Sequence, residues 1–348
     1  MIPRSTLAEG YSISRIIKGG WHLAGDHGAI EPRQARADMA RFVEAGITTF
    51  DCADIYTGVE AMIGEFLREY PSLAGRVQVH TKFVPDLSDL ASVDSQYVES
   101  IIDRSLQRLG VERLDLVQFH WWDFAVPRYV EAALELERLR RAGKIRHVGV
   151  TNFDTRHLAE IVTAGVPVVS HQLQYSILDE RPATAMVEFC RAHGIGLLCY
   201  GTVSGGFLSE RWLGRPEPRE LSNRSLIKYQ LIIDDFGGWS TFQELLGTLA
   251  RIAARHQSDV ASIATRAILD RPQVNAAIVG ATSTAHLDAH ARIGSLRLDA
   301  TDLAAIAAVT SRRRGPRGDV YELERDRSGR HGQIMKYELN STGERNND

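Results

Sequence analysis

The chain has 348 residues, of which 44% are hydrophobic and 24% are charged, and its formal net charge is -3 at pH 7. This length and composition predict a globular protein that buries a large core without help from metals or disulfides. Such a small net charge gives no general attraction to nucleic acid or to an anionic membrane. Its three cysteines, Cys52, Cys190 and Cys199, lack metal-ligand spacing, and their odd number argues against a disulfide framework. No apolar leader and no stretch of membrane-spanning length is present, so we expect a soluble, cytoplasmic protein.

Short apolar runs recur along the chain, and segments with helical periodicity lie between them. The runs are SRIIKG (14–19), ITTFD (47–51), VQVHTK (77–82), LDLVQFH (114–120), HVGVTN (147–152), VVSHQLQ (168–174), IGLLCY (195–200) and AAIVG (276–280). Amphipathic segments include 33–46, 94–110 and 131–143. In the last of these, we expect a buried stripe formed by Leu134, Leu136, Leu139 and Ala142.

Eight strand signals that alternate with helices indicate parallel strands joined by crossovers. A doubly wound sheet uses the same alternation, but eight units in one chain of this length favour a (β/α)8 TIM barrel. The segment 201–257 is too long for one loop and one helix, which predicts a long loop after the seventh strand. We therefore expect a single barrel domain over residues 1–310. Residues 311–348 form a charged C-terminal extension, whose end NSTGERNND (340–348) is predicted to be disordered.

Polar residues occupy the C-terminal ends of six consecutive predicted strands, where barrel enzymes carry their catalytic groups. One tyrosine lies just beyond the first of these ends, and the full set is Asp51, Tyr56, Lys82, His120, Asn152, Gln172 and Tyr200. Residues that served only solubility would be scattered over the helices instead. The pattern therefore predicts one functional site at this end of the barrel.

The residue types in this set suit proton transfer to a carbonyl oxygen. A lysine ammonium near a phenol lowers the pKa of the tyrosine, and a buried lysine needs an anion such as Asp51 to stay charged. His120 is expected to donate a hydrogen bond that orients the carbonyl. Carbonyl reduction also needs a hydride, which no side chain supplies, so a cofactor is implied.

Four segments carry a resemblance to a known family. AGITTFDCADIYTGVEAMIGEFL (45–67) resembles the second-strand signature of the aldo-keto reductases, and Asp51 and Tyr56 meet its Asp–x4–Tyr spacing. VHTKF (79–83) resembles the family's lysine strand, and DLVQFHWWD (115–123) resembles its histidine strand. GKIRHVGVTNF (143–153) resembles the family's fifth-strand block. Short motifs are weak individually, but the ordered set is specific. It implies a (β/α)8 NAD(P)H-dependent oxidoreductase of aldehydes, ketones or alcohols, with Tyr56 as general acid or base.

The same resemblance implies a site for the whole cofactor and for the substrate. The catalytic residues would be Asp51, Tyr56, Lys82 and His120. Cofactor-binding residues would be Gly20, Trp21, Asp51, Thr151, Asn152, Gln172 and Tyr200 at the nicotinamide, then Gly201, Thr202, Val203, Gly206 and Leu208 along the pyrophosphate, then Gly280, Thr282, His286 and His290 at the adenosine. Substrate-binding residues would be Trp21, Tyr56, His120, Trp121 and Trp122. No metal is expected.

The adenosine block departs from the family pattern, because Thr282 stands where an arginine or lysine is common and His286 where an arginine or glutamine is common. We expect NADP(H) to be preferred, with NAD(H) possible. An alternative function is a cofactor-binding regulatory subunit with little turnover, because SLIKYQ (225–230) resembles a loop of potassium-channel β-subunits. A metal-dependent hydrolase is a weaker alternative, since His120 and Asp123 lack further zinc ligands. A monomer and a homo-oligomer both remain open, and residues 311–340 either cover the barrel mouth or form a solvated tail.

Overall fold

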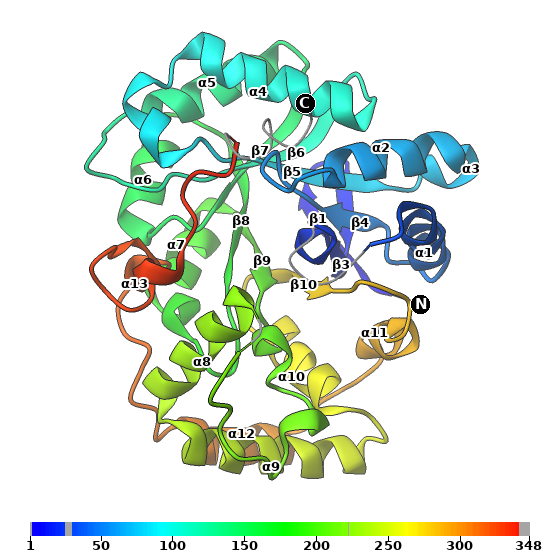
Figure 1. Cartoon of the computed structure of the whole chain (residues 1–348), viewed down its shortest axis with the longest axis vertical. Helices are drawn as coiled ribbons and strands as arrows, with labels where there is room; N and C mark the ends of the chain where they lie inside the picture. Colours follow the sequence, from blue (N-terminus) through cyan, green and yellow to red (C-terminus); the bar gives the residue numbers. More distant parts are fainter. Residues whose placement is uncertain (1, 25–29, 222, 341–348) are drawn as a thin grey trace.

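The structure is a computed structural model that describes residues 2–24, 30–221 and 223–340. Eight parallel strands close into a barrel in the order β10-β3-β4-β5-β6-β7-β8-β9 (Figure 1). Their bounds are β3 Ile16–Gly19, β4 Thr49–Asp51, β5 Gln78–Phe83, β6 Leu114–Phe119, β7 Ile145–Thr151, β8 Val168–Gln174, β9 Gly196–Tyr200 and β10 Val274–Gly280. All eight predicted strands and the predicted (β/α)8 barrel are thus confirmed.

Helices surround the barrel and connect its strands (Figure 1). They are α1 Pro32–Glu44, α2 Val59–Glu69, α3 Pro71–Ala74, α4 Ser95–Leu109, α5 Tyr129–Arg141, α6 Thr155–Thr163, α7 Ala185–His193, α8 Arg224–Phe236, α9 Trp239–Arg255, α10 Val260–Leu269, α11 Leu287–Ile293, α12 Ala300–Thr310 and α13 Glu322–Arg325. Their apolar faces pack on the outer side of the strands, and this forms the main core.

The buried stripe predicted for α5 is partly wrong. Leu136 and Leu139 are buried as expected, but Leu134 is 41% exposed and Ala142 is exposed. The stripe that packs on the barrel instead runs through Tyr129, Ala132, Ala133, Leu136 and Leu139. These positions follow the spacing of three and four residues, whereas Leu134 lies two residues from Leu136 and so points away from the core.

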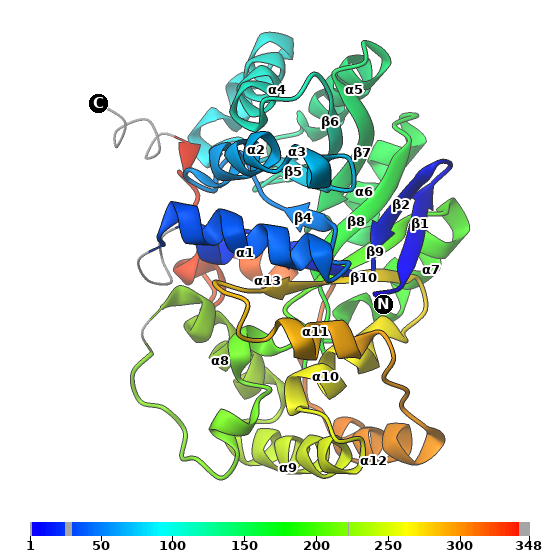
Figure 2. The ribbon, with the colours of Figure 1, turned by 90° about the vertical axis from the view of Figure 1, so that its right-hand side faces the viewer.

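An N-terminal hairpin, which the sequence analysis did not identify, covers the barrel end opposite the polar strand ends. It consists of β1 (Arg4–Ala8) and β2 (Tyr11–Ser14), and Figure 2 shows it in dark blue beside β8, β9 and β10. Its side chains Leu7, Tyr11 and Ile13 are buried together with inward-facing residues of the barrel strands. The hairpin therefore closes one end of the barrel interior, and the end with the polar strand ends stays open for a site.

The long loop after the seventh barrel strand, β9, is confirmed. Its described residues form only the short 3-10 helices η4 (Ser204–Gly206) and η5 (Glu210–Trp212) before α8 begins.

Residues 311–340 pack against the barrel mouth, with Tyr321 and His331 buried, so they are not a solvated tail (Figure 1, red). They contain α13 and the 3-10 helix η6 (Gly332–Ile334). The domain division at residue 310 stays a prediction, and residues 341–348 lie outside the described residues.

Candidate active site

A cavity of about 850 Å³ opens at the C-terminal ends of the barrel strands. Its lining includes all four predicted catalytic residues, Asp51, Tyr56, Lys82 and His120. From there it continues along the loop after β9 to the N-terminal ends of α10 and α11. This volume is in the usual range for a small-molecule or cofactor site.

A buried ion pair between Asp51 and Lys82 forms the floor of the cavity. The Lys82 Nζ atom lies 2.7 Å from Asp51 Oδ2 and also donates a hydrogen bond of 2.7 Å to the main-chain oxygen of Cys52. Both side chains are 5% exposed. Burial lowers the pKa of Lys82, but the Asp51 carboxylate and, to a smaller extent, Tyr56 and Cys52 together raise the pKa above its ordinary value. Lys82 is therefore a fixed positive charge.

Tyr56 lies next to this charge, on the loop between β4 and α2. The Lys82 Nζ atom is 4.8 Å from the centre of the Tyr56 ring. Burial raises the pKa of the Tyr56 phenol, and the Lys82 ammonium opposes that rise without cancelling it. The net shift is upward, whereas the sequence analysis expected Lys82 to lower the pKa. The phenol consequently keeps its proton at neutral pH, which suits a general acid.

His120 follows β6, and its ring is held by the neighbouring strand. Its Nδ1 atom lies 3.2 Å from the main-chain oxygen of Thr151. A carbonyl oxygen only accepts hydrogen bonds, so Nδ1 carries a proton. Burial, followed by the charge of Arg325, lowers the pKa of His120 to about 3, so the ring is neutral. Its Nε2 atom then has no proton to donate, and it is buried without a hydrogen-bond partner among the described residues.

Gln118 joins this cluster, although the sequence analysis did not single it out. Its Nε2 atom donates to Asp51 Oδ1 at 2.9 Å, and Gln172 donates to the same oxygen at 2.6 Å and to Gln118 Oε1 at 2.9 Å. Asp51 is thus held by three side chains. The signal that could have revealed Gln118 is its position two residues before His120, because alternate residues of a strand face the same side.

The expected nicotinamide end of the site is assembled from three strands. Tyr200 at the end of β9 donates a hydrogen bond of 2.8 Å to Asn152 Oδ1. Asn152 has a φ of 61°, a left-handed conformation that asparagine tolerates better than most residues. Thr151 and Gln172 also line the cavity.

Gly20 is not in the lining, but its amide donates to the Asp51 main-chain oxygen at 2.7 Å, and a Cβ there would lie 2.7 Å from that oxygen.

The glycine-rich loop after β9 and the last strand extend the cavity away from the catalytic residues. Its lining includes Gly201, Thr202, Val203, Gly206, Leu208, Gly280, His286 and His290. A Cβ on Gly201 would lie 2.5 Å from the Tyr229 hydroxyl, so the loop needs glycine there. Thr282 is exposed and lies outside this lining. Arg211 and Arg224 also line the cavity, and they supply positive charge at positions other than those of the family pattern.

The three tryptophans expected to contact substrate occupy two different environments. Trp21 and Trp122 line the cavity beside Tyr56 and His120, and the Trp122 and His120 rings meet edge to face with centres 4.2 Å apart. Trp121 is fully buried outside the lining, where its indole donates to the main-chain oxygens of Asp123 and Val126. The structure therefore does not bring Trp121 to the site.

The C-terminal extension and α8 contribute further cavity residues, and of these only Tyr321 was singled out from the sequence, as part of an extension that could cover the barrel mouth. Tyr321, Ile334, Met335 and Leu339 line the cavity from the extension, and Lys228 lines it from α8. The Tyr321 ring lies 5.6 Å from the His120 ring. No periodic pattern in residues 311–340 marks these positions, and only contact with the barrel identifies them.

The cysteine thiols lie in environments that disfavour the reactive thiolate. All three cysteines are free and buried, and burial raises the pKa of Cys190 to about 12 and that of Cys52 well above its ordinary value. Over residues 2–24, 30–221 and 223–340, no group of three or more His, Cys, Asp or Glu side chains has an arrangement that could hold a metal ion. Nor does any helix in this part of the chain have the length and apolar character needed to cross a membrane.

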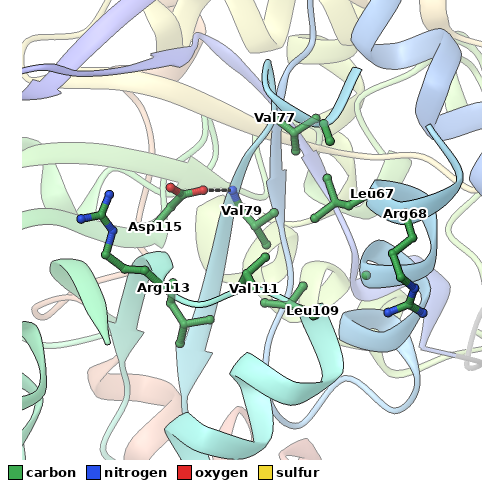
Figure 3. A pocket seen from close by; sticks show the side chains of 12 residues that line it. Leu67, Arg68, Val77, Val79, Leu109, Val111, Arg113 and Asp115 are labelled. Carbon is green, nitrogen blue, oxygen red and sulfur yellow. Dashed lines mark hydrogen bonds between the residues drawn. The ribbon is translucent and has the colours of Figure 1, made fainter. Parts of the chain in front are cut away.

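A second cavity, of about 360 Å³, lies between the end of α2, the end of α4 and the starts of β5 and β6 (Figure 3). Apolar side chains including Leu67, Val77 and Leu109 line it, with Arg68 and Arg113 at its sides. None of the predicted site residues lines this cavity.

Comparison with known proteins agrees with this arrangement. The sequence profile of the aldo/keto reductase family matches residues 15–311. A probable aldo-keto reductase of Glycine max is 26% identical over 323 residues, which cover 90% of this chain and 88% of that protein. Flagellar radial spoke protein 5 of Chlamydomonas reinhardtii is 29% identical over 257 residues, 63% of this chain, and the match spans only about half (49%) of that relative.

A solved glycerol dehydrogenase structure from Gluconobacter oxydans has the same fold, with a TM-score of 0.74, 22% identity, and coverage of 88% of this chain and 95% of that one. The family profile covers most of the chain, and the barrel carries the family's arrangement of strands. The chain therefore belongs to the aldo/keto reductase family, whose general activity is NAD(P)H-dependent oxidation and reduction of carbonyl compounds.

Proposed function

We propose that the protein reduces an aldehyde or ketone to an alcohol, or catalyses the reverse reaction, with Tyr56 as the general acid or base. The observation that carries this proposal is the buried Lys82 ammonium, which lies 2.7 Å from Asp51 Oδ2 and 4.8 Å from the Tyr56 ring centre at the floor of the cavity. A fixed positive charge beside a phenol stabilises the phenolate that forms when the proton leaves.

A nicotinamide cofactor fits the residues of this cavity. The cavity extends from the catalytic residues past a loop in which Gly201 leaves no space for a Cβ, and two arginines, Arg211 and Arg224, also line it. Thr151, Asn152, Gln172 and Tyr200 would hold the nicotinamide, and Arg211 and Arg224 would face the phosphate-bearing adenosine. When bound in its reduced form, the cofactor supplies the hydride that goes to the carbonyl carbon.

The side chains complete the reaction by moving one proton. As negative charge develops on the carbonyl oxygen, the Tyr56 hydroxyl donates its proton to that oxygen, and Lys82 stabilises the phenolate left behind. Asp51 keeps Lys82 charged and in place. The His120 ring, packed against Trp122 and Tyr321, forms the wall that directs the carbonyl towards Tyr56. Alcohol oxidation uses the same proton path in reverse.

We further propose that NADP(H) is preferred over NAD(H). Arg211 and Arg224 line the cavity. Arginine binds phosphate through two-point, charge-assisted hydrogen bonds, so these two guanidinium groups favour an additional phosphate.

The test is Tyr56→Phe, assayed against a panel of carbonyl compounds and sugars with NADPH and NADH in parallel. We expect kcat to fall by roughly 10²- to 10⁴-fold, the usual contribution of a general acid, while cofactor affinity is retained. Tyr70→Phe, which changes a tyrosine packed on Phe66 outside the cavity, is the matched control and should keep full activity. Full activity of Tyr56→Phe would disprove the assignment. Tight cofactor binding by the wild type, without turnover of any compound, would favour the regulatory alternative.

A further inference from the structure

Two adjacent residues of α13, Glu324 and Arg325, connect the C-terminal extension to different parts of the barrel mouth. Glu324 is 1% exposed, and the guanidinium nitrogens Nε and Nη1 of Arg325 are buried. Burying charged groups in an extension is costly unless their contacts compensate. Their partners therefore indicate what the extension does at the site.

Arg325 contacts the main chain of both loops that adjoin His120. Its Nη2 atom donates a hydrogen bond of 2.6 Å to the Asn152 oxygen and one of 3.1 Å to the Trp121 oxygen. Trp121 is the residue directly after His120. Asn152 directly follows Thr151, whose oxygen binds His120 Nδ1. One guanidinium thus ties together the ends of β6 and β7 at the point where they hold the imidazole.

The guanidinium is also held in place by aromatic rings. Its central carbon lies 4.1 Å from the centre of the Phe124 ring and 5.3 Å from that of Tyr321. Such stacking stabilises a partly desolvated cation. The Nε and Nη1 atoms have no hydrogen-bond partner among the described residues, so the hydrogen bonds of this side chain are concentrated on the two loop oxygens.

Glu324 fixes the position from which Arg325 reaches these loops. Its carboxylate forms a two-point pair with Arg181, at 2.9 and 3.1 Å, and lies 3.7 Å from Lys228 Nζ on α8. Arg181 in turn pairs with Asp179 at 2.8 Å. Two-point pairs of this kind restrict orientation as well as distance. The short helix α13 is therefore anchored to the loop after β8 and to α8.

We propose that Arg325 is a positioning residue of the active site: it holds the main chain at Trp121 and Asn152 so that His120 and the Asn152 side chain keep their orientations in the cavity. This inference rests on the proposed function, in which His120 directs the carbonyl and Asn152 holds the nicotinamide. The C-terminal extension thereby contributes to turnover, although Arg325 itself does not line the cavity and acts through its contacts with the loop main chain.

The experiment compares Arg325→Met with Arg327→Met in the full-length protein. Arg327 lies two residues away on the same extension, pairs with Asp123 at 3.2 Å and is 57% exposed, so it matches the chemistry without touching the loop main chain. For Arg325→Met we expect kcat to fall by on the order of 10- to 100-fold, the cost of slight misplacement of reacting groups. The carbonyl KM should stay nearly unchanged, the pattern of an interaction lost in the transition state. Arg327→Met should match the wild type.

Arg325→Lys provides the rescue measurement. A lysine keeps the charge and one donor but loses the fork that reaches two oxygens, so its kcat should lie between those of wild type and Arg325→Met. Should Arg325→Met fail to fold, a kcat below that of wild type with unchanged KM in Arg325→Lys supports the proposal by itself. Wild-type kcat in the folded variants, or a rise in KM without a fall in kcat, overturns it. Either result leaves the proposed function intact, because that function is tested separately by the activity of Tyr56→Phe.

Discussion

The Nδ1 atom of His120 lies 3.2 Å from the main-chain oxygen of Thr151, so the proton of the neutral ring is on the side away from its unpartnered Nε2 atom. We predict that this tautomer persists in solution. Because burial and the Arg325 charge lower the pKa of His120 to about 3, the ring should stay neutral from pH 5 to pH 8. The measurement is the ¹⁵N chemical shift of both ring nitrogens over that range, assigned by comparison with His120→Asn.

A His120 signal that titrates near the ordinary histidine pKa of about 6.5, or that shows the proton on Nε2, would contradict this prediction. It would instead support a His120 that donates a hydrogen bond to the substrate oxygen, as the sequence analysis expected.

The Asp51–Lys82 pair allows stability and catalysis to be separated. Lys82→Met leaves the Asp51 carboxylate buried without its cation, and breaking such a pair costs about 3–5 kcal/mol of unfolding free energy. The double variant Lys82→Met/Asp51→Asn removes both charges, so we expect much of this loss to be recovered. Both variants should have very low kcat, because neither has a positive charge beside Tyr56. Urea denaturation and steady-state assays give the two quantities.

Equal stability of the single and double variants would show that the buried charge of Asp51 is not the source of the loss. Recovery of activity in the double variant would argue against a catalytic role for Lys82.

The sequence predicted the barrel and most of the site because both depend on local signals. Each strand end is marked by an apolar run followed by a polar residue, and closure of the barrel brings Asp51, Lys82 and His120 together without further information. The hairpin β1–β2 was missed because its burial depends on the barrel that it covers. The α13 pair of Glu324 and Arg325 was missed for a related reason: in a charged segment, only partners more than 100 residues away distinguish buried ions from solvated ones.

Buried neutral histidines should make the protein sensitive to acid, and His171 allows this effect to be isolated. Burial lowers the pKa of His171 to about 3, whereas the unfolded chain binds the proton near pH 6.5. The stabilising contribution of the neutral ring is therefore fully present above pH 6.5 and is lost as the pH falls from 6.5 towards 3. Relative to His171→Gln, wild type should lose roughly 1.4 kcal/mol of unfolding free energy for each pH unit in that window.

Urea denaturation of both proteins at pH 5, 6, 7 and 8 measures this difference. We expect the stability advantage of wild type to shrink between pH 6 and pH 5 and to stay constant between pH 7 and pH 8. Parallel pH profiles would mean that His171 has the same pKa in the folded protein as in the unfolded chain. Its Nε2 atom accepts a hydrogen bond of 3.1 Å from the Phe153 amide, which argues against that outcome because a protonated Nε2 could not accept it.

Cofactor preference should depend on Arg211 and Arg224, two arginines that line the cavity. Arg224 begins α8 and Arg211 lies in η5, and both line the cavity, whereas Thr282 does not. A hydrogen bond to a charged group contributes about 1.5–3 kcal/mol, so Arg224→Gln and Arg211→Gln should each raise the Kd for NADPH by roughly tenfold or more. The Kd for NADH, which lacks the additional phosphate, should change little.

Arg219→Gln is the control, because Arg219 is exposed on the same loop but lies outside the lining. Equal weakening of both cofactors would place the arginines at the pyrophosphate instead, and tighter binding of NADH by wild type would reverse the proposed preference.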